Sequence, residues 1–96
     1  KIQSDNFVKN IIKINPLGKK CKSFNWRVIT IDGHDFKQIQ RAINKFKKEK
    51  NNPTIIIANT IKGKGVSFME NNPLWHGSID IGQKNYEKAI KELSNE

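Results

Sequence analysis

The middle of the chain has the hydrophobic pattern of a strand, a helix and a second strand. Residues 26–31 and residues 54–58 are short runs dense in β-branched apolar side chains, which predicts strands covered on both faces, as in a parallel sheet. Four apolar residues recur at helical spacing between the two runs: Phe36, Ile39, Ile43 and Phe46. This order predicts a strand–helix–strand unit with parallel strands and a right-handed crossover.

Local signals mark the two ends of the predicted central helix. Asp35, followed by Gln38 three residues later, has the pattern of a capping box, so the helix is expected to begin there. Lysines in the last turn complement the helix dipole up to about Lys50, and residues 51–53 end the helix with a proline.

Weaker patterns flank this unit. Asn15 and Pro16 predict a helix start, with Asn15 at the N-cap and Pro16 in the first turn. One apolar face of that helix is formed by Leu17, Cys21 and Phe24. A final amphipathic helix is predicted from about Gln83 to Leu93. For residues 5–14 both a short helix and an irregular turn fit the pattern.

Composition narrows the class of protein. The 96 residues carry 18 Lys and Arg against 9 Asp and Glu, a formal charge of +9, which raises the prior for partners that bear phosphate. Nearly all of these cations are lysines spread along the chain, so we interpret most of them as a solvated surface and do not expect nucleic acid as the partner. There is no long apolar run and no signal peptide, which argues against a membrane span. The single cysteine fits a reducing, cytoplasmic compartment.

The candidate chemistry follows the second strand, in residues 60–77. A Gly-Lys-Gly turn there could bring backbone N–H groups and an ammonium close to an anion, and open α/β sheets bind ligands at the carboxyl ends of their strands. The side chains in this loop with chemistry to offer are Lys62, Lys64, Trp75 and His76. Considered alone, each of them also fits a structural role, as a solvated lysine, a packed tryptophan or a loop histidine.

Three ordered segments of the chain resemble the transketolase family of thiamine diphosphate enzymes, and the likeness extends from about Asn15 to Leu93. The segments are Trp26 to Asp35, Pro53 to Val66, and Trp75-His76-Gly77. The resemblance implies an α/β fold: part of a doubly wound, Rossmann-like parallel sheet with helices on both faces. Residues 1–96 would then be the C-terminal part of the diphosphate-binding domain, in an incomplete form.

The resemblance also implies roles for three residues. Lys62 corresponds to a family lysine near the cofactor diphosphate, and His76 to a histidine that reaches both the diphosphate and the donor sugar. Ile61 lies where the family contacts the thiazolium ring, although core packing explains it equally well. We expect Lys64 to be peripheral, and Trp75, like Trp26 and His34, to be structural. Ser78 departs from the family, since many members carry a basic residue there, which leaves the donor preference open.

The remaining expectations concern the assembly. The cofactor would be thiamine diphosphate with a divalent cation, Mg²⁺ or Ca²⁺, held by residues outside this chain, and we assign no metal ligand here. The partner would be a C-terminal transketolase subunit or the remainder of a longer chain, in a homodimer or heterotetramer acting on sugar phosphates of the pentose phosphate pathway. The chain alone is expected to be inactive. The alternatives are a deoxyxylulose phosphate synthase-like enzyme, a basic nucleic-acid-binding module and a noncatalytic scaffold.

Overall fold

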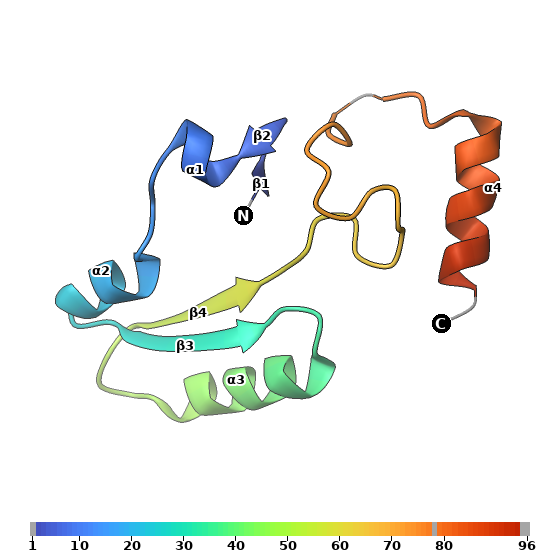
Figure 1. Cartoon of the computed structure of the whole chain (residues 1–96). Helices are drawn as coiled ribbons and strands as arrows, with labels where there is room; N and C mark the ends of the chain where they lie inside the picture. Colours follow the sequence, from blue (N-terminus) through green and yellow to red (C-terminus); the bar gives the residue numbers. More distant parts are fainter. Residues whose placement is uncertain (1, 78, 95–96) are drawn as a thin grey trace. The chain divides into compact units, whose positions relative to one another are not determined.

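The structure is a computed structural model that describes residues 2–77 and 79–94. The chain divides into two compact units, and Figure 1 shows the elements that each contains. One unit comprises residues 14–60, and the other comprises the described parts of residues 1–13 and 61–96. None of the helices in the described part of the chain is both long and apolar enough to cross a membrane.

The unit of residues 14–60 is built on two parallel strands. Strand β3 (Arg27–Asp32) pairs with β4 (Thr54–Asn59), in a register that begins at Arg27 opposite Thr54 and ends at Asp32 opposite Asn59. Helix α3 (Phe36–Lys48) connects the strands. Figure 1 shows α2 (Leu17–Ser23) and α3 on opposite sides of the strand pair. The predicted α/β unit with parallel strands and helices on both faces is therefore confirmed.

Helix α2 differs from its prediction at both ends. Pro16, not Asn15, occupies the N-cap, because the Pro16 carbonyl accepts the hydrogen bond from the Lys20 N–H at 3.2 Å. The helix ends at Ser23, so Phe24 is the C-cap and does not continue the apolar face. The Phe24 side chain is 76% exposed, whereas Cys21 is half-buried. The predicted face therefore fails at Phe24, beyond the last helical turn.

The connection from β3 to α3 is fixed by the predicted cap. Asp35 is the N-cap of α3, and its Oδ1 accepts hydrogen bonds from the backbone N–H groups of Lys37 and Gln38. The Gln38 amide donates to Asp35 Oδ2 at 2.9 Å, while its Oε1 accepts from the Asp32 N–H at 3.0 Å. The bonds that the Asp35 carboxylate accepts, first from the Gln38 N–H and then from the Gln38 amide, lower the pKa of Asp35. Gln38 thus ties the helix start to the last residue of β3, a variation on the capping box.

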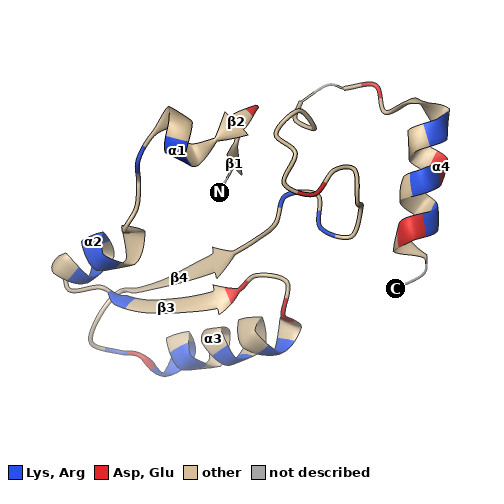
Figure 2. Ribbon diagram, viewed as in Figure 1, with Lys and Arg blue, Asp and Glu red and all other residues tan. Residues whose placement is uncertain are grey.

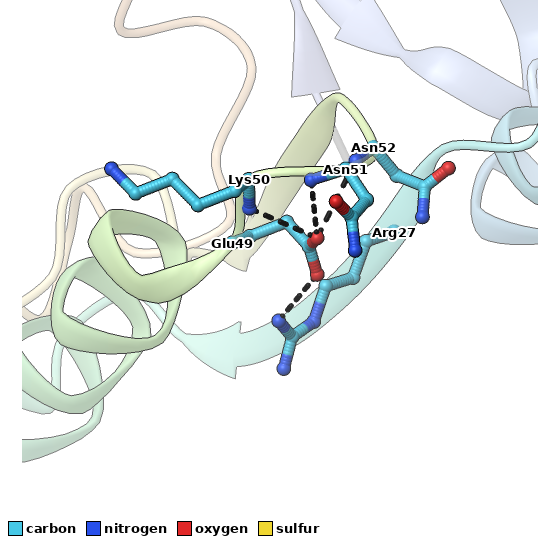
Figure 3. A network of polar contacts seen from close by, with 5 residues as sticks. All are labelled: Arg27, Glu49, Lys50, Asn51 and Asn52. Carbon is cyan, nitrogen blue, oxygen red and sulfur yellow. Dashed lines mark hydrogen bonds and ion pairs between the residues drawn. The ribbon is translucent and has the colours of Figure 1, made fainter.

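The turn from α3 to β4 is organised by one carboxylate. Glu49 Oε1 accepts hydrogen bonds from three consecutive backbone N–H groups, those of Lys50, Asn51 and Asn52, at 3.1, 2.9 and 3.4 Å (Figure 3). Its Oε2 accepts from Arg27 Nη1 at 2.8 Å, at the start of β3. The Asn51 N–H, followed by Arg27, lowers the pKa of Glu49. The amino ends of the two strands are thereby joined through a single side chain.

The core of this unit is thin. Its buried hydrophobic residues, among those described, are Ile31 on β3 and Ala42 on α3. The predicted amphipathic pattern of α3 does form a helix, yet Phe36 is 86% exposed and Phe46 is 49% exposed. A helical period places these side chains on one face, but it does not show what covers that face.

The second unit contains a short hairpin, a long loop and the last helix. Strands β1 (Ile2–Gln3) and β2 (Asn6–Phe7) pair antiparallel, and α1 (Val8–Ile11) follows directly. The segment for which helix and turn both remained open thus holds one helical turn after a hairpin strand. The final helix is α4 (Gly82–Leu93), one residue longer at its start than predicted. Its buried residue is Ala89, and Val66 is the buried residue of the loop.

Candidate functional site

The loop after β4 folds back on itself. Gly63 and Gly65 have φ angles of +74° and +92°, a region that favours glycine. A Cβ at Gly63 would lie 2.6 Å from the carbonyl carbon and oxygen of Met69, which leaves room only for hydrogen. The Asn71 N–H donates to the Lys62 carbonyl at 3.0 Å and closes the loop at its base. Lys62 therefore sits at the neck of a compact, internally bonded loop.

The Gly-Lys-Gly turn does not form the anion-binding cradle that was expected from its sequence. The N–H groups of Lys64 and Val66 donate to carbonyls within the turn, those of Ile61 and Gly63. The Gly65 N–H donates to the carboxylate of Glu70 at 3.1 Å. The three successive backbone donors of residues 64–66 are therefore already used inside the loop.

The two lysines of the turn have different surroundings. The Lys64 ammonium lies 3.5 Å from Glu70 Oε1 in an ion pair near the surface, which supports the peripheral role expected for it. The half-buried Lys62 donates to the neutral backbone carbonyl of Ser4 at 3.2 Å. Within the described residues no carboxylate forms an ion pair with Lys62. An ammonium has three donors and one positive charge, so Lys62 is suited to an anionic ligand.

Trp75 holds the far end of the loop. Its indole N–H donates to the Phe68 carbonyl at 3.1 Å, and the two rings meet edge to face with centroids 5.4 Å apart. The half-buried Trp75 thus packs inside the loop, in agreement with the structural role expected for it. His76, the next residue, is exposed, and its backbone N–H donates to the Leu74 carbonyl. Gly77 has a φ of +76°, and a Cβ there would meet nothing within 4 Å.

The structure places all three predicted site residues in one unit. Ile61 and Lys62 lie at the start of the loop, where both are half-buried, and His76 lies near its end. Between the side chains of Lys62 and His76, both of which are described, no hydrogen bond is formed. Their convergence on one ligand stays a prediction. Ser78, the departure from the family pattern, lies outside the described residues.

Sequence reasoning missed the attachment of helix α4 to the loop. Glu92 accepts two hydrogen bonds from Ser67, one from its backbone N–H at 2.5 Å and one from its hydroxyl at 2.8 Å. The Ser67 N–H, followed by the hydroxyl, lowers the pKa of Glu92. The contact joins residues 25 positions apart, and no local sequence pattern predicts a hydrogen bond between residues at that separation.

Charge and metal chemistry complete the description. Figure 2 shows Lys and Arg distributed along the helices, with no single element collecting them, which fits the solvated surface inferred from the sequence. Among the described residues, no group of three or more His, Cys, Asp and Glu side chains could hold a metal ion. The donor set at the loop is cationic and suits a phosphate better than a cation.

Comparison with known proteins gives a consistent result. The family model described as "Transketolase, thiamine diphosphate binding domain" matches residues 2–94. The chain is 35% identical over its full length to the 6-deoxy-6-sulfo-D-fructose transketolase subunit SqwG of Clostridium sp., and 34% identical to an apulose-4-phosphate transketolase subunit of Actinobacillus succinogenes. It spans 34% of the length of each of these two proteins. Over 75 residues it is also 36% identical to human transketolase, covering 78% of this chain and 11% of that protein.

Proposed function

The chain belongs to the transketolase family, in the thiamine diphosphate binding domain, and we propose that it supplies one wall of a cofactor site for ketol transfer. In this proposal Lys62 binds the diphosphate, and His76 contacts the diphosphate and the donor sugar. The assembled enzyme moves a two-carbon unit from a ketose phosphate to an aldose phosphate. Because the chain spans a third of its subunit relatives, this activity is proposed for the whole protein of which these 96 residues form part.

The observation that carries the proposal is the environment of Lys62. Lys62 is half-buried as a residue, and its ammonium is bonded to the neutral carbonyl of Ser4 and forms no ion pair with a carboxylate among the described residues. The ammonium therefore keeps its positive charge and further donors for a phosphate. Lys64, in the same turn, is already paired with Glu70. Of the two lysines in the turn, Lys62 is therefore the available cation, at the position that matches the family lysine.

His76 is suited to a second role at the same ligand. The preceding residue, Trp75, is held by its hydrogen bond to the Phe68 carbonyl, and this restricts the backbone that bears the exposed His76. A neutral imidazole donates at one nitrogen and accepts at the other, so it can exchange a proton with a substrate hydroxyl that lies within hydrogen-bond distance. We assign it to orient the sugar hydroxyls and to exchange protons with them. Ile61, adjacent to Lys62 and half-buried, would provide an apolar contact to the cofactor ring.

When bound, thiamine diphosphate would supply a nucleophilic ring carbon and a cationic thiazolium ring that serves as an electron sink for cleavage of a carbon–carbon bond. This chain contributes charge and hydrogen bonds around it. A divalent cation, Mg²⁺ or Ca²⁺, would be held by residues outside the 96. Two relatives are named as subunits, which supports a separate C-terminal partner subunit. We propose a heterotetramer with that subunit, or a homodimer if the remaining part belongs to the same chain. We place the enzyme in the cytoplasm, acting on sugar phosphates of the pentose phosphate pathway.

A ketol-transfer assay tests the proposal. The full-length protein would be combined with its partner subunit, thiamine diphosphate and Mg²⁺, and given a panel of ketose donors with an aldose phosphate acceptor. The panel includes sulfofructose and apulose phosphate because proteins similar to this chain are named for them. We expect cofactor-dependent transfer of a two-carbon unit. Condensation of pyruvate with glyceraldehyde 3-phosphate instead would indicate a deoxyxylulose phosphate synthase-like enzyme and contradict the proposal.

A further inference from the structure

Helix α4 contacts the loop of residues 61–77 at two adjacent residues, Ser67 and Phe68. The Glu92 carboxylate accepts both donors of Ser67, its N–H and its hydroxyl. Lys88, one turn earlier on the same helix, lies 3.8 Å from Glu92 and places its ammonium 5.1 Å from the centre of the Phe68 ring. A carboxylate, an ammonium and an aromatic ring thus form one connected contact between the helix and the loop.

The same Ser67–Phe68 pair holds the end of the loop that carries His76. The Phe68 carbonyl accepts hydrogen bonds from the Trp75 indole at 3.1 Å and from the Asn72 amide at 3.4 Å. The Phe68 ring also packs edge to face on the Trp75 ring. A shift of Phe68 would therefore move Trp75, and with it the residue that follows. Glu92 is connected to His76 through Ser67, Phe68 and Trp75 by contacts that are all present in the structure.

We propose that Glu92 is a positioning residue of the cofactor-binding loop, holding Ser67 so that Trp75 and His76 are fixed before the ligand arrives. This inference rests on the proposed function, because it takes thiamine diphosphate as the ligand of the loop. A carboxylate offers two acceptor oxygens to the two donors of Ser67, and its negative charge strengthens both hydrogen bonds. A glutamine of the same shape could still accept from the Ser67 N–H and donate to the Ser67 hydroxyl oxygen, but both bonds would lose that charge and become weaker. Fixing the loop in advance lowers the ordering cost of binding.

A matched pair of variants in the full-length protein tests this role. Glu92→Gln removes the charge and keeps the shape. Glu87→Gln makes the same change on the same helix, where Glu87 accepts a hydrogen bond from Gln83 within the helix. Two quantities are measured: the ¹⁹F NMR signal of Trp75 in protein containing 5-fluorotryptophan, assigned with Trp75→Phe, and the dissociation constant for thiamine diphosphate in the presence of Mg²⁺. A third variant, Ser67→Ala, and its double with Glu92→Gln show whether the two residues act together.

We expect Glu92→Gln to shift or broaden the Trp75 signal without cofactor and to raise the dissociation constant about fivefold to tenfold, in the range of couplings between linked sites. Glu87→Gln should leave both quantities unchanged. The double variant, Ser67→Ala with Glu92→Gln, should lose less binding free energy than the sum of the losses in the two single variants. An unchanged Trp75 signal in Glu92→Gln would overturn the inference, as would a shifted signal with an unchanged dissociation constant. If the wild type binds no thiamine diphosphate at all, the proposed function fails, while a shifted Trp75 signal still shows that Glu92 positions the loop.

Discussion

The ammonium of Lys62 donates a hydrogen bond to the backbone carbonyl of Ser4, across 58 positions of sequence and 3.2 Å of space. Ser4 has a φ of +54° and lies in the connection between β1 and β2, so the carbonyl that receives the ammonium belongs to a tight hairpin. A single neutral acceptor directs the ammonium without neutralising it. Lys62 is in this sense oriented and still charged.

The first prediction concerns that charge. Lys62→Met keeps the aliphatic stem and removes the ammonium, so the dissociation constant for thiamine diphosphate in the full-length protein should rise about tenfold or more, the scale of a hydrogen bond to a charged group. Lys64→Met in the same turn is the control, because Lys64 is paired with Glu70. Isothermal titration calorimetry measures both. Equal effects of the two substitutions would mean that the overall charge of the loop matters and Lys62 has no special role.

The second prediction separates binding from turnover. His76→Gln should lower kcat/KM for the ketose donor by about 100-fold, a typical contribution of a proton-exchanging side chain. The loss in cofactor affinity should be smaller than that of Lys62→Met. Steady-state kinetics of ketol transfer provide the measurement, with His34→Gln, in the connection between β3 and α3, as the control. If His76→Gln has the kcat/KM of the wild type, His76 takes no part in catalysis or in donor binding.

The third prediction uses two glycines with similar backbone angles. Gly63 and Gly82 have φ angles of +74° and +68°, but a Cβ at Gly63 would meet Met69 at 2.6 Å, whereas one at Gly82 would meet nothing within 4 Å. Gly82→Ala should therefore cost only the left-handed strain, about 1 kcal/mol. Gly63→Ala should cost more than about 3 kcal/mol, since a backbone clash adds to the strain, and should abolish cofactor binding. Chemical denaturation of the full-length protein measures the loss of unfolding free energy in each variant. Equal losses would show that the loop backbone can shift to accommodate a Cβ at Gly63.

The fourth prediction follows from the lowered pKa of Glu49. A carboxyl group whose pKa is lower in the folded protein stabilises the fold above its unfolded pKa, and that stabilisation is lost as the pH falls through the folded value. Glu49→Gln should therefore lower the free energy of unfolding at pH 7. The difference from wild type should shrink as the pH drops below about 4.3. Urea unfolding across this pH range tests the sign, with Glu87→Gln as the comparison. A difference that grows in acid would contradict the assignment.

A fifth prediction concerns the 96 residues by themselves. The buried hydrophobic residues of the described chain are Ile31, Ala42, Val66 and Ala89, while large side chains such as Phe24 and Phe36 are mostly exposed. So small a core stabilises a chain of this length poorly. We expect isothermal titration calorimetry of the isolated chain with thiamine diphosphate and Mg²⁺ to detect no binding. Tight binding would show that the loop assembles without further polypeptide.

Features that depend on neighbours in sequence could be predicted. The Asp35 cap, the helix after it and the parallel strands follow from periods and residue spacings that act over a few positions, and all three are present. The family resemblance rested on short ordered motifs, and the match to residues 2–94 bears it out.

Features that depend on contacts distant in sequence could not be predicted. The bond from Lys62 to Ser4 and the grip of Glu92 on Ser67 join positions that share no local pattern. The prediction that the Gly-Lys-Gly turn binds an anion through its backbone N–H groups was also wrong. Glycine permits several backbone conformations, and the sequence does not show that these N–H groups donate to acceptors within the loop. For α3, the helical period gave the apolar face but not its exposure.

The turn around Glu49 has a consequence for where phosphate can bind. Three N–H groups that converge on one oxygen, beside a guanidinium, would by themselves form a binding site for an inorganic anion. The chain fills that site with its own carboxylate (Figure 3), which acts as an internal counter-ion at the amino ends of the strands. Because Glu49 occupies this anion-binding site, the site is not available to bind the cofactor diphosphate in competition with the loop of residues 61–77.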